Sequence, residues 1–199
     1  MRNEYEKGLY LEYFTVGYNF IEAGVAILLG ILASSIALVG FGMDSIIETL
    51  SGFILIWRLR QQETISKEHE EKLEQRAMKF VALTFFVLGG YVIVQSVRKL
   101  IAGIPPEPSL PGIILAGISL IIMPFLAYGK IKVGKEIDSG ALLADAKETL
   151  ACAFLSLSLF LGLAGNYFFG LWQADPIAAT IIAIFLFKEG WETWQEAGE

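Results

Sequence analysis

Two acidic residues, Asp44 and Glu48, lie four positions apart inside a long apolar run from Ala33 to Trp57. In a helix this spacing places both carboxylates on one face, about 6 Å apart along the axis. A charge at the centre of a bilayer costs at least ~2.5 kcal/mol, so two charges on one face need partners or a bound cation. The pair therefore predicts a cation site at membrane depth.

A second pair with the same spacing occurs later in the chain. Glu148 and Cys152 lie four positions apart in another apolar run, and an alignment of residues 37–48 with residues 141–152 places the two pairs in register. Three carboxylates and one thiol on two facing helices would make a four-ligand cation site. The register also favours an inverted repeat of three plus three helices with a site at the midplane. Because the aligned segments share few identical residues, a chance match is the alternative.

The residue types indicate which cation would bind. Carboxylates with one thiol and no imidazole suit a divalent ion of intermediate softness, such as Zn(II), and to varying degrees Fe(II), Mn(II), Co(II) or Cd(II). Three carboxylates carry more negative charge than a divalent ion neutralises, so we expect some ligands of an empty site to hold protons. Metal binding then displaces protons, which predicts exchange of metal for protons.

Each of these residues also has a simpler interpretation. Glu48 is alternatively an interfacial residue, although apolar or small residues follow it as far as Trp57. Glu148 is alternatively the partner of Lys147, although adjacent helical residues point about 100° apart. Cys152 on its own is alternatively a packing residue of an apolar core.

Other polar residues have predicted supporting roles. Asn19 and Glu22, three positions apart on one helix face, are expected either to support the ligands or to line an aqueous cavity. Asp145, which precedes Glu148 by three positions, is expected to have the same kind of role. His69 is the single histidine and lies among charged residues, so it is predicted to be a surface residue, with metal binding as the alternative. Asp175 precedes Pro176 and is predicted to be the N-cap of the last helix.

The whole chain has the composition of an integral membrane protein. Its 199 residues are 55% hydrophobic and 18% charged, with a mean hydropathy of +0.58. We predict an all-α, polytopic membrane protein that forms a single domain of six transmembrane helices. The expected spans cover about residues 12–32, 36–57, 77–101, 113–128, 141–163 and 176–194.

Charge distribution predicts the orientation. Lys and Arg gather after the second and fourth spans, where GKIKVGKEIDSG is expected to be a basic loop, so both termini are predicted to be cytoplasmic. We expect the location to be a prokaryotic plasma membrane.

The net charge of −6 and the lack of a basic stripe argue against a nucleic-acid partner. No nucleophile–base pair or cofactor motif is present, so neither an enzyme nor a cofactor is expected.

The two motifs resemble those of the transmembrane part of the cation diffusion facilitator family, which exports Zn(II), Fe(II), Mn(II) and related ions in exchange for protons. SSIALVGFGMDSIIETLSG is similar to the family's helix-two motif, with Asp44 and Glu48 in the ligand positions. ALLADAKETLACAF is similar to the helix-five motif. There the resemblance places Asp145 at the Asp that precedes the ligands, Glu148 at the usual His and Cys152 at the usual Asp.

The resemblance covers about residues 10 to 195 and implies a six-helix metal exporter. Glu148 and Cys152 depart from the usual His and Asp, which leaves the preferred metal open. The family's C-terminal cytoplasmic domain is expected to be absent because the sequence ends at Glu199, so a homodimer would form through the membrane helices.

We expect export of a divalent metal, Zn(II) above others, by alternating access. A non-transporting metal-binding or regulatory subunit and a proton-coupled small-molecule exporter are the alternatives.

Overall fold

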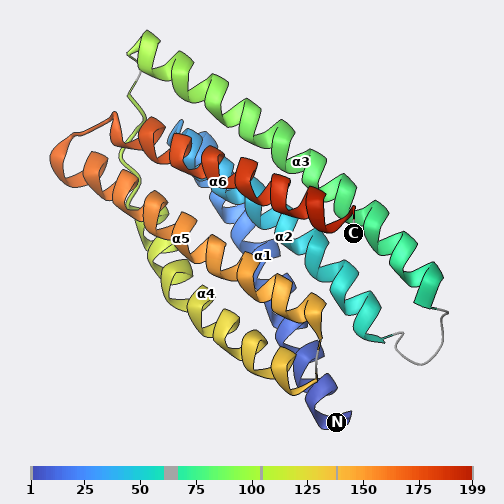
Figure 1. Ribbon diagram of the computed structural model, residues 1–199. Coiled ribbons are helices and arrows are strands. Elements are labelled where there is room, and N and C mark those ends of the chain that lie inside the picture. Colours follow the sequence, from blue (N-terminus) through green and yellow to red (C-terminus); the bar gives the residue numbers. More distant parts are fainter. Residues whose placement is uncertain (1, 61–66, 104, 138, 199) are drawn as a thin grey trace.

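The computed structural model of the protein describes residues 2–60, 67–103, 105–137 and 139–198. His69 lies in a stretch of helix whose side chains are outside this description, so its predicted role stays a prediction. All regular structure in the described residues is helical, which confirms the predicted all-α class (Figure 1). The helices are α1 (Arg2–Leu32), α2 (Ile36–Arg60), α3 (Lys67–Ala102), α4 (Leu110–Glu136), α5 (Gly140–Phe169) and α6 (Ala174–Glu196).

Within the described residues, α1 to α5 are each long and apolar enough to cross a membrane. This confirms the predicted polytopic membrane protein. Helix α6 runs alongside them, but it has Asp175 near its start and Lys188, Glu189 and Glu192 near its end. These charges shorten its apolar stretch, so its role as a sixth span remains a prediction.

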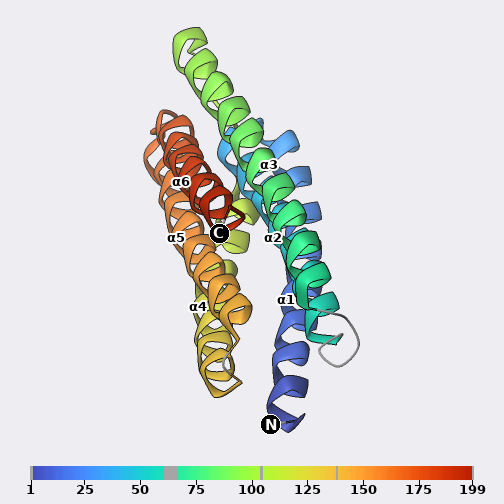
Figure 2. The same cartoon turned by 45° about the vertical axis from the view of Figure 1, so that its right-hand side comes forward.

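The helices pack mainly as three pairs. Helix α1 packs along α2, α4 along α5, and α3 along α6 (Figures 1 and 2). Helix α2 is central, because it also contacts α3, α5 and α6. The contacts are also nearly symmetric between the two halves of the chain. If α1 is swapped with α4, α2 with α5 and α3 with α6, each contact falls on another observed contact, except the one between α2 and α6. The arrangement agrees with an inverted repeat, which itself remains a prediction.

Glycines allow α1 and α2 to approach closely. A Cβ atom on Gly42 would lie 2.8 Å from Ile27 Cγ1 and 3.0 Å from Ala26 Cβ. A Cβ on Gly52 would lie 2.5 Å from Val16 Cγ2. Larger residues at these two positions would push the helices apart. The close approach brings polar residues of α1 within reach of the acidic pair on α2.

Helix α4 extends beyond the end predicted for the fourth span. Residues 129–136 are helical and not a loop, and Lys130 is fully buried. Lys130 follows Leu126 by four positions and Met123 by seven, so it continues the buried face of the helix. Carboxylates on neighbouring helices hold its charge there. The sequence interpretation of Lys130 as a loop residue was therefore wrong.

Asp175 does not cap α6, contrary to the prediction. The N-cap position of α6 is Gln173, whose side chain makes no capping bond. The buried Asp175 carboxylate instead accepts hydrogen bonds from Ser35 Oγ and, at 3.3 Å, from the Ile36 backbone N–H. Lys99 Nζ of α3 lies 3.6 Å from Asp175 Oδ2. The first turn of α2 has free N–H groups that attract an anion, so Asp175 stabilises α2 and joins it to α3 and α6.

Candidate metal site

Asp44, Glu48 and Cys152 meet inside the bundle. The two carboxylates come from α2 and the thiol from α5, and one ligand atom of each lies within 4.8 Å of the other two. The residues are 4%, 7% and 1% exposed, respectively. Glu48 therefore lies inside the helix bundle, and its depth in the membrane stays a prediction. The structure thus brings three of the four predicted ligands together.

The spacing of this cluster suits a metal ion with a small adjustment. Ligand atoms at the usual 2.0–2.3 Å from Zn(II) are roughly 3.5 Å from one another in a tetrahedron. The three atoms of the cluster therefore need to approach by about an ångström to share one ion. Two acidic oxygens and one sulfur are donors that a divalent ion of intermediate softness accepts.

Glu148, the fourth predicted ligand, lies outside this three-residue cluster. It is on α5, one turn before Cys152, and its Oε2 accepts a hydrogen bond from Ser51 Oγ at 3.1 Å. Ser51 follows Glu48 on α2 by three positions. The Glu148 side chain therefore faces α2 next to the cluster, and its role as a ligand stays a prediction.

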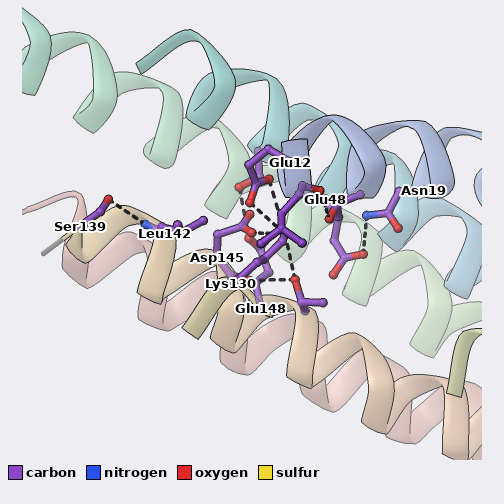
Figure 3. A network of polar contacts seen from close by, with 12 residues as sticks. Glu12, Asn19, Glu48, Lys130, Ser139, Leu142, Asp145 and Glu148 are labelled. Atoms are coloured by element: carbon purple, nitrogen blue, oxygen red, sulfur yellow. Dashed lines mark hydrogen bonds and ion pairs between the residues drawn. The ribbon is translucent and has the colours of Figure 1, made fainter. Parts of the chain in front are cut away.

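Asn19 contacts the cluster directly. Its Nδ2 donates a hydrogen bond to Glu48 Oε2 at 3.0 Å (Figure 3). The residue is fully buried, and its Oδ1 has no hydrogen-bond partner among the described residues. This geometry agrees with the predicted role of supporting a ligand, because a hydrogen bond to one carboxylate oxygen limits the rotation of Glu48.

Glu22 lies among hydroxyl groups from three helices. Tyr18 Oη donates to Glu22 Oε1 and Ser45 Oγ donates to Glu22 Oε2, each at 3.0 Å. Ser119 Oγ of α4 also donates to Glu22 Oε1. Ser45 is the neighbour of Asp44 in the chain, so this network joins α1 and α4 to the acidic face of α2.

A buried ion-pair cluster was missed by the sequence analysis. The Lys130 ammonium lies 3.2 Å from Glu12 Oε1 of α1, forms an ion pair with Asp145 of α5, and lies 3.3 Å from Thr149 Oγ1 (Figure 3). Asp145 thus pairs with Lys130, and its predicted role of supporting the ligands or lining a cavity stays a prediction. The sequence did contain one indication of this burial. Lys130 follows the buried Leu126 by four positions, so it lies on the buried face of α4.

A comparison with known protein families gives a match over most of the chain. Residues 14–199 match the cation efflux transmembrane domain. The chain therefore belongs to the cation efflux family. The predicted resemblance, based on the motifs of α2 and α5, is confirmed.

Several relatives match nearly the whole chain. Transmembrane protein 163 of Xenopus laevis is 21% identical over 190 residues, which are 95% of this chain and 66% of that protein. The uncharacterized transporter YdbO of Bacillus subtilis (strain 168) is 26% identical over 197 residues, 96% of this chain and 66% of the relative. The manganese efflux system protein MneS of the same organism is 22% identical over 200 residues, 98% of this chain and 68% of the relative. The chain thus spans about two thirds of the length of these relatives.

Proposed function

We propose that the protein exports a divalent transition-metal cation through the membrane, Zn(II) above others. The observation that carries this proposal is the buried cluster of Asp44, Glu48 and Cys152 on two membrane-spanning helices. Carboxylate oxygens accept most divalent ions, whereas a thiolate favours Zn(II) or Cd(II) over the harder Mn(II). Because MneS is named for manganese efflux, Mn(II) is the first competitor to test.

Glu148 is the proposed fourth ligand. It needs to exchange its hydrogen bond with Ser51 for the metal ion, and both Ser51 and Glu48 lie on the face of α2 that meets α5. Asn19 is proposed to hold Glu48 in position while this exchange occurs. The ion would then bind between α2 and α5, with α1 as a support.

The proposal includes exchange of the metal ion for protons. Two carboxylates and a thiolate this close repel one another strongly when all are ionised and no cation is present. The empty site is therefore expected to hold protons that an arriving metal ion displaces. Glu48 and Glu148 are the proposed proton carriers, and alternating access would expose the site to each side in turn.

We extend the proposal to orientation and assembly. Lys132 and Lys135 are exposed near the end of α4, at the same end of the bundle as the N-terminus (Figure 1). An excess of Lys and Arg marks the cytoplasmic side, so both termini are proposed to be cytoplasmic in a prokaryotic plasma membrane. A homodimer through the membrane helices completes the proposal.

Uptake of Zn(II) into inverted vesicles tests the proposed function. Vesicles with the wild-type protein are expected to accumulate the ion, and those with Asp44→Ala to fall to the level of protein-free vesicles. Glu192→Gln is the matched control, because this carboxylate is exposed near the end of α6 and is expected to leave uptake unchanged.

The same vesicles separate the rival functions. Uptake by Asp44→Ala at the wild-type rate would reject the site. Metal binding by the wild type without flux would favour a regulatory subunit. Proton release driven by an organic substrate, without metal, would favour a small-molecule exporter.

A further inference from the structure

Glu12, Lys130 and Asp145 form a buried ion-pair cluster apart from the proposed metal ligands. The side chains of Lys130 and Glu12 are 0% exposed and that of Asp145 is 11% exposed. Removing charges from water is costly, and well-packed apolar residues of similar volume are often as stable or more stable. A contribution to the stability of the fold therefore does not explain why these three charged side chains are buried.

The ion-pair cluster lies between the metal site and the N-terminal end of the bundle, where α1 begins and α5 begins. Glu12 precedes Asn19 on α1 by seven positions, and Asp145 precedes Cys152 on α5 by the same number. Seven positions are about two helical turns, or roughly 10 Å. Figure 3 shows the cluster between Glu48 and the first turn of α5. An ion that leaves the metal site toward this end would meet the cluster.

A pocket of about 530 Å³ lies between α1 and α4 at this end of the bundle. It is lined by Leu11 and Gly129, the chain neighbours of Glu12 and Lys130, and by charged side chains that include Glu6 and Lys132. The pocket therefore extends from the level of the ion-pair cluster toward the N-terminal end.

The cluster also joins two parts of the bundle. Helices α1 and α2 pack extensively on each other, as do α4 and α5, whereas α1 contacts α4 and α2 contacts α5 less extensively. Glu12 belongs to the first pair of helices, and Lys130 and Asp145 belong to the second. Separation of the two pairs at the N-terminal end would require the Lys130–Glu12 contact to break.

We propose that the Glu12–Lys130–Asp145 cluster is the closed gate of an access route between this pocket and the metal site. The inference rests on the proposed function, which requires the buried ligands to become reachable from one side at a time. In the closed state the Lys130 ammonium joins the two helix pairs and neutralises one of the two carboxylates. An approaching divalent cation competes with Lys130 for the same carboxylates, so the arriving charge itself favours opening.

Cys152 allows the gate to be tested without measuring transport, because it is the single cysteine of the chain and lies at the metal site. The readout is the rate at which a membrane-impermeant maleimide modifies Cys152 in metal-free sealed vesicles. The reagent is added either on the side where an N-terminal tag is accessible or on the opposite side.

Lys130→Gln is expected to raise the modification rate from the side of the tag at least about tenfold, which corresponds to about 1.4 kcal/mol in the gate equilibrium. Lys132→Gln is the matched control, since this lysine lines the pocket two positions further along α4 and is exposed. Its rate is expected to equal that of the wild type.

Lys130→Gln leaves two buried carboxylates without their cation, and this could unfold the protein. A second variant without these charges is therefore needed. The triple variant E12Q/K130Q/D145N leaves no buried charge in the cluster, and it is expected to show the same increase. A wild-type rate in the folded triple variant, or an equal increase from both sides, would overturn the gate. If the wild type transports metal but the variants modify Cys152 at the wild-type rate, only the gate is rejected. If the wild type shows no metal flux, the proposed function is rejected, and the modification rates of Cys152 still decide the gate.

Discussion

Cys152 packs in the apolar core and also completes the acidic cluster. It is among the buried residues of the main core, with Phe41 and Leu155 as fellow members, and its thiol is also close to Asp44 and Glu48. A buried thiol usually acts as a small apolar group. Beside two carboxylates a thiol is a soft donor, and we propose that Cys152 uses it to discriminate among divalent ions.

Replacement of this thiol should change the ion preference more than the ability to transport. Cys152→Ser substitutes a harder oxygen for sulfur, so preference is expected to shift from Zn(II) or Cd(II) toward Mn(II). Competition between Zn(II) and Mn(II) for uptake measures the shift. Cys152→Ala, which offers no donor, is the control and is expected to weaken uptake of both ions. An unchanged order of ions in Cys152→Ser would remove Cys152 from the ligands.

At the level of helices, the α1–α2 contact determines how α1 supports the site. Gly42 lies two positions before Asp44, and a Cβ atom there would meet Ala26 and Ile27 of α1. The same contact allows Asn19 to reach Glu48 at 3.0 Å. A shift of α1 by a fraction of an ångström would therefore loosen the hydrogen bond that orients a ligand.

Gly42→Ala should destabilise the protein through this contact. Its new methyl group would approach Ile27 Cγ1 to 2.8 Å, and such overpacking costs about 1–3 kcal/mol. Thermal unfolding in detergent is expected at a lower temperature than for the wild type. Gly24→Ala is the matched control, because among the described residues nothing lies within 4 Å of the place that its methyl group would take. Equal midpoints for the two variants would contradict the close contact.

The local sequence pattern was sufficient to predict that Asp44, Glu48 and Cys152 lie together, and insufficient to predict the ion pairs. Asp44, Glu48 and Cys152 could be predicted because each motif lies within one helix and its spacing of four fixes a common face. Lys130 could not be assigned a partner, because Glu12 lies on a different helix and is distant in the sequence. Asp175 was misassigned for the same reason: its nearest helix start in sequence is α6, but in space it lies against the first turn of α2.

Across the whole molecule, buried charges occur at both ends of the bundle. Lys130 and its partners lie toward the N-terminal end, and Asp175 with Lys99 lies at the opposite end, where α2 and α6 begin. Asp44, Glu48 and Cys152, the proposed metal ligands, lie between these two levels. This distribution fits a carrier in which each end can open in turn, since ion pairs can hold an end closed without a permanent apolar seal.

The exchange of metal for protons predicts a pH dependence of binding. Protons compete with the metal ion for the same carboxylates and thiol, so the affinity for Zn(II) should fall as the pH is lowered and rise as it is raised. Titration calorimetry in two buffers with different ionisation enthalpies measures the number of protons released. Asp44→Asn is expected to release fewer protons than the wild type. An affinity that is independent of pH would contradict the exchange.

X-ray absorption of the purified protein loaded with Zn(II) will show whether Asp44, Glu48 and Cys152 bind one metal ion within the bundle. We expect one sulfur ligand at about 2.3 Å together with oxygen ligands. The sulfur signal should be lost in Cys152→Ser, and the bound metal should be lost in Asp44→Ala. A wild-type spectrum with no sulfur ligand, or full metal occupancy in Asp44→Ala, would contradict the proposed site.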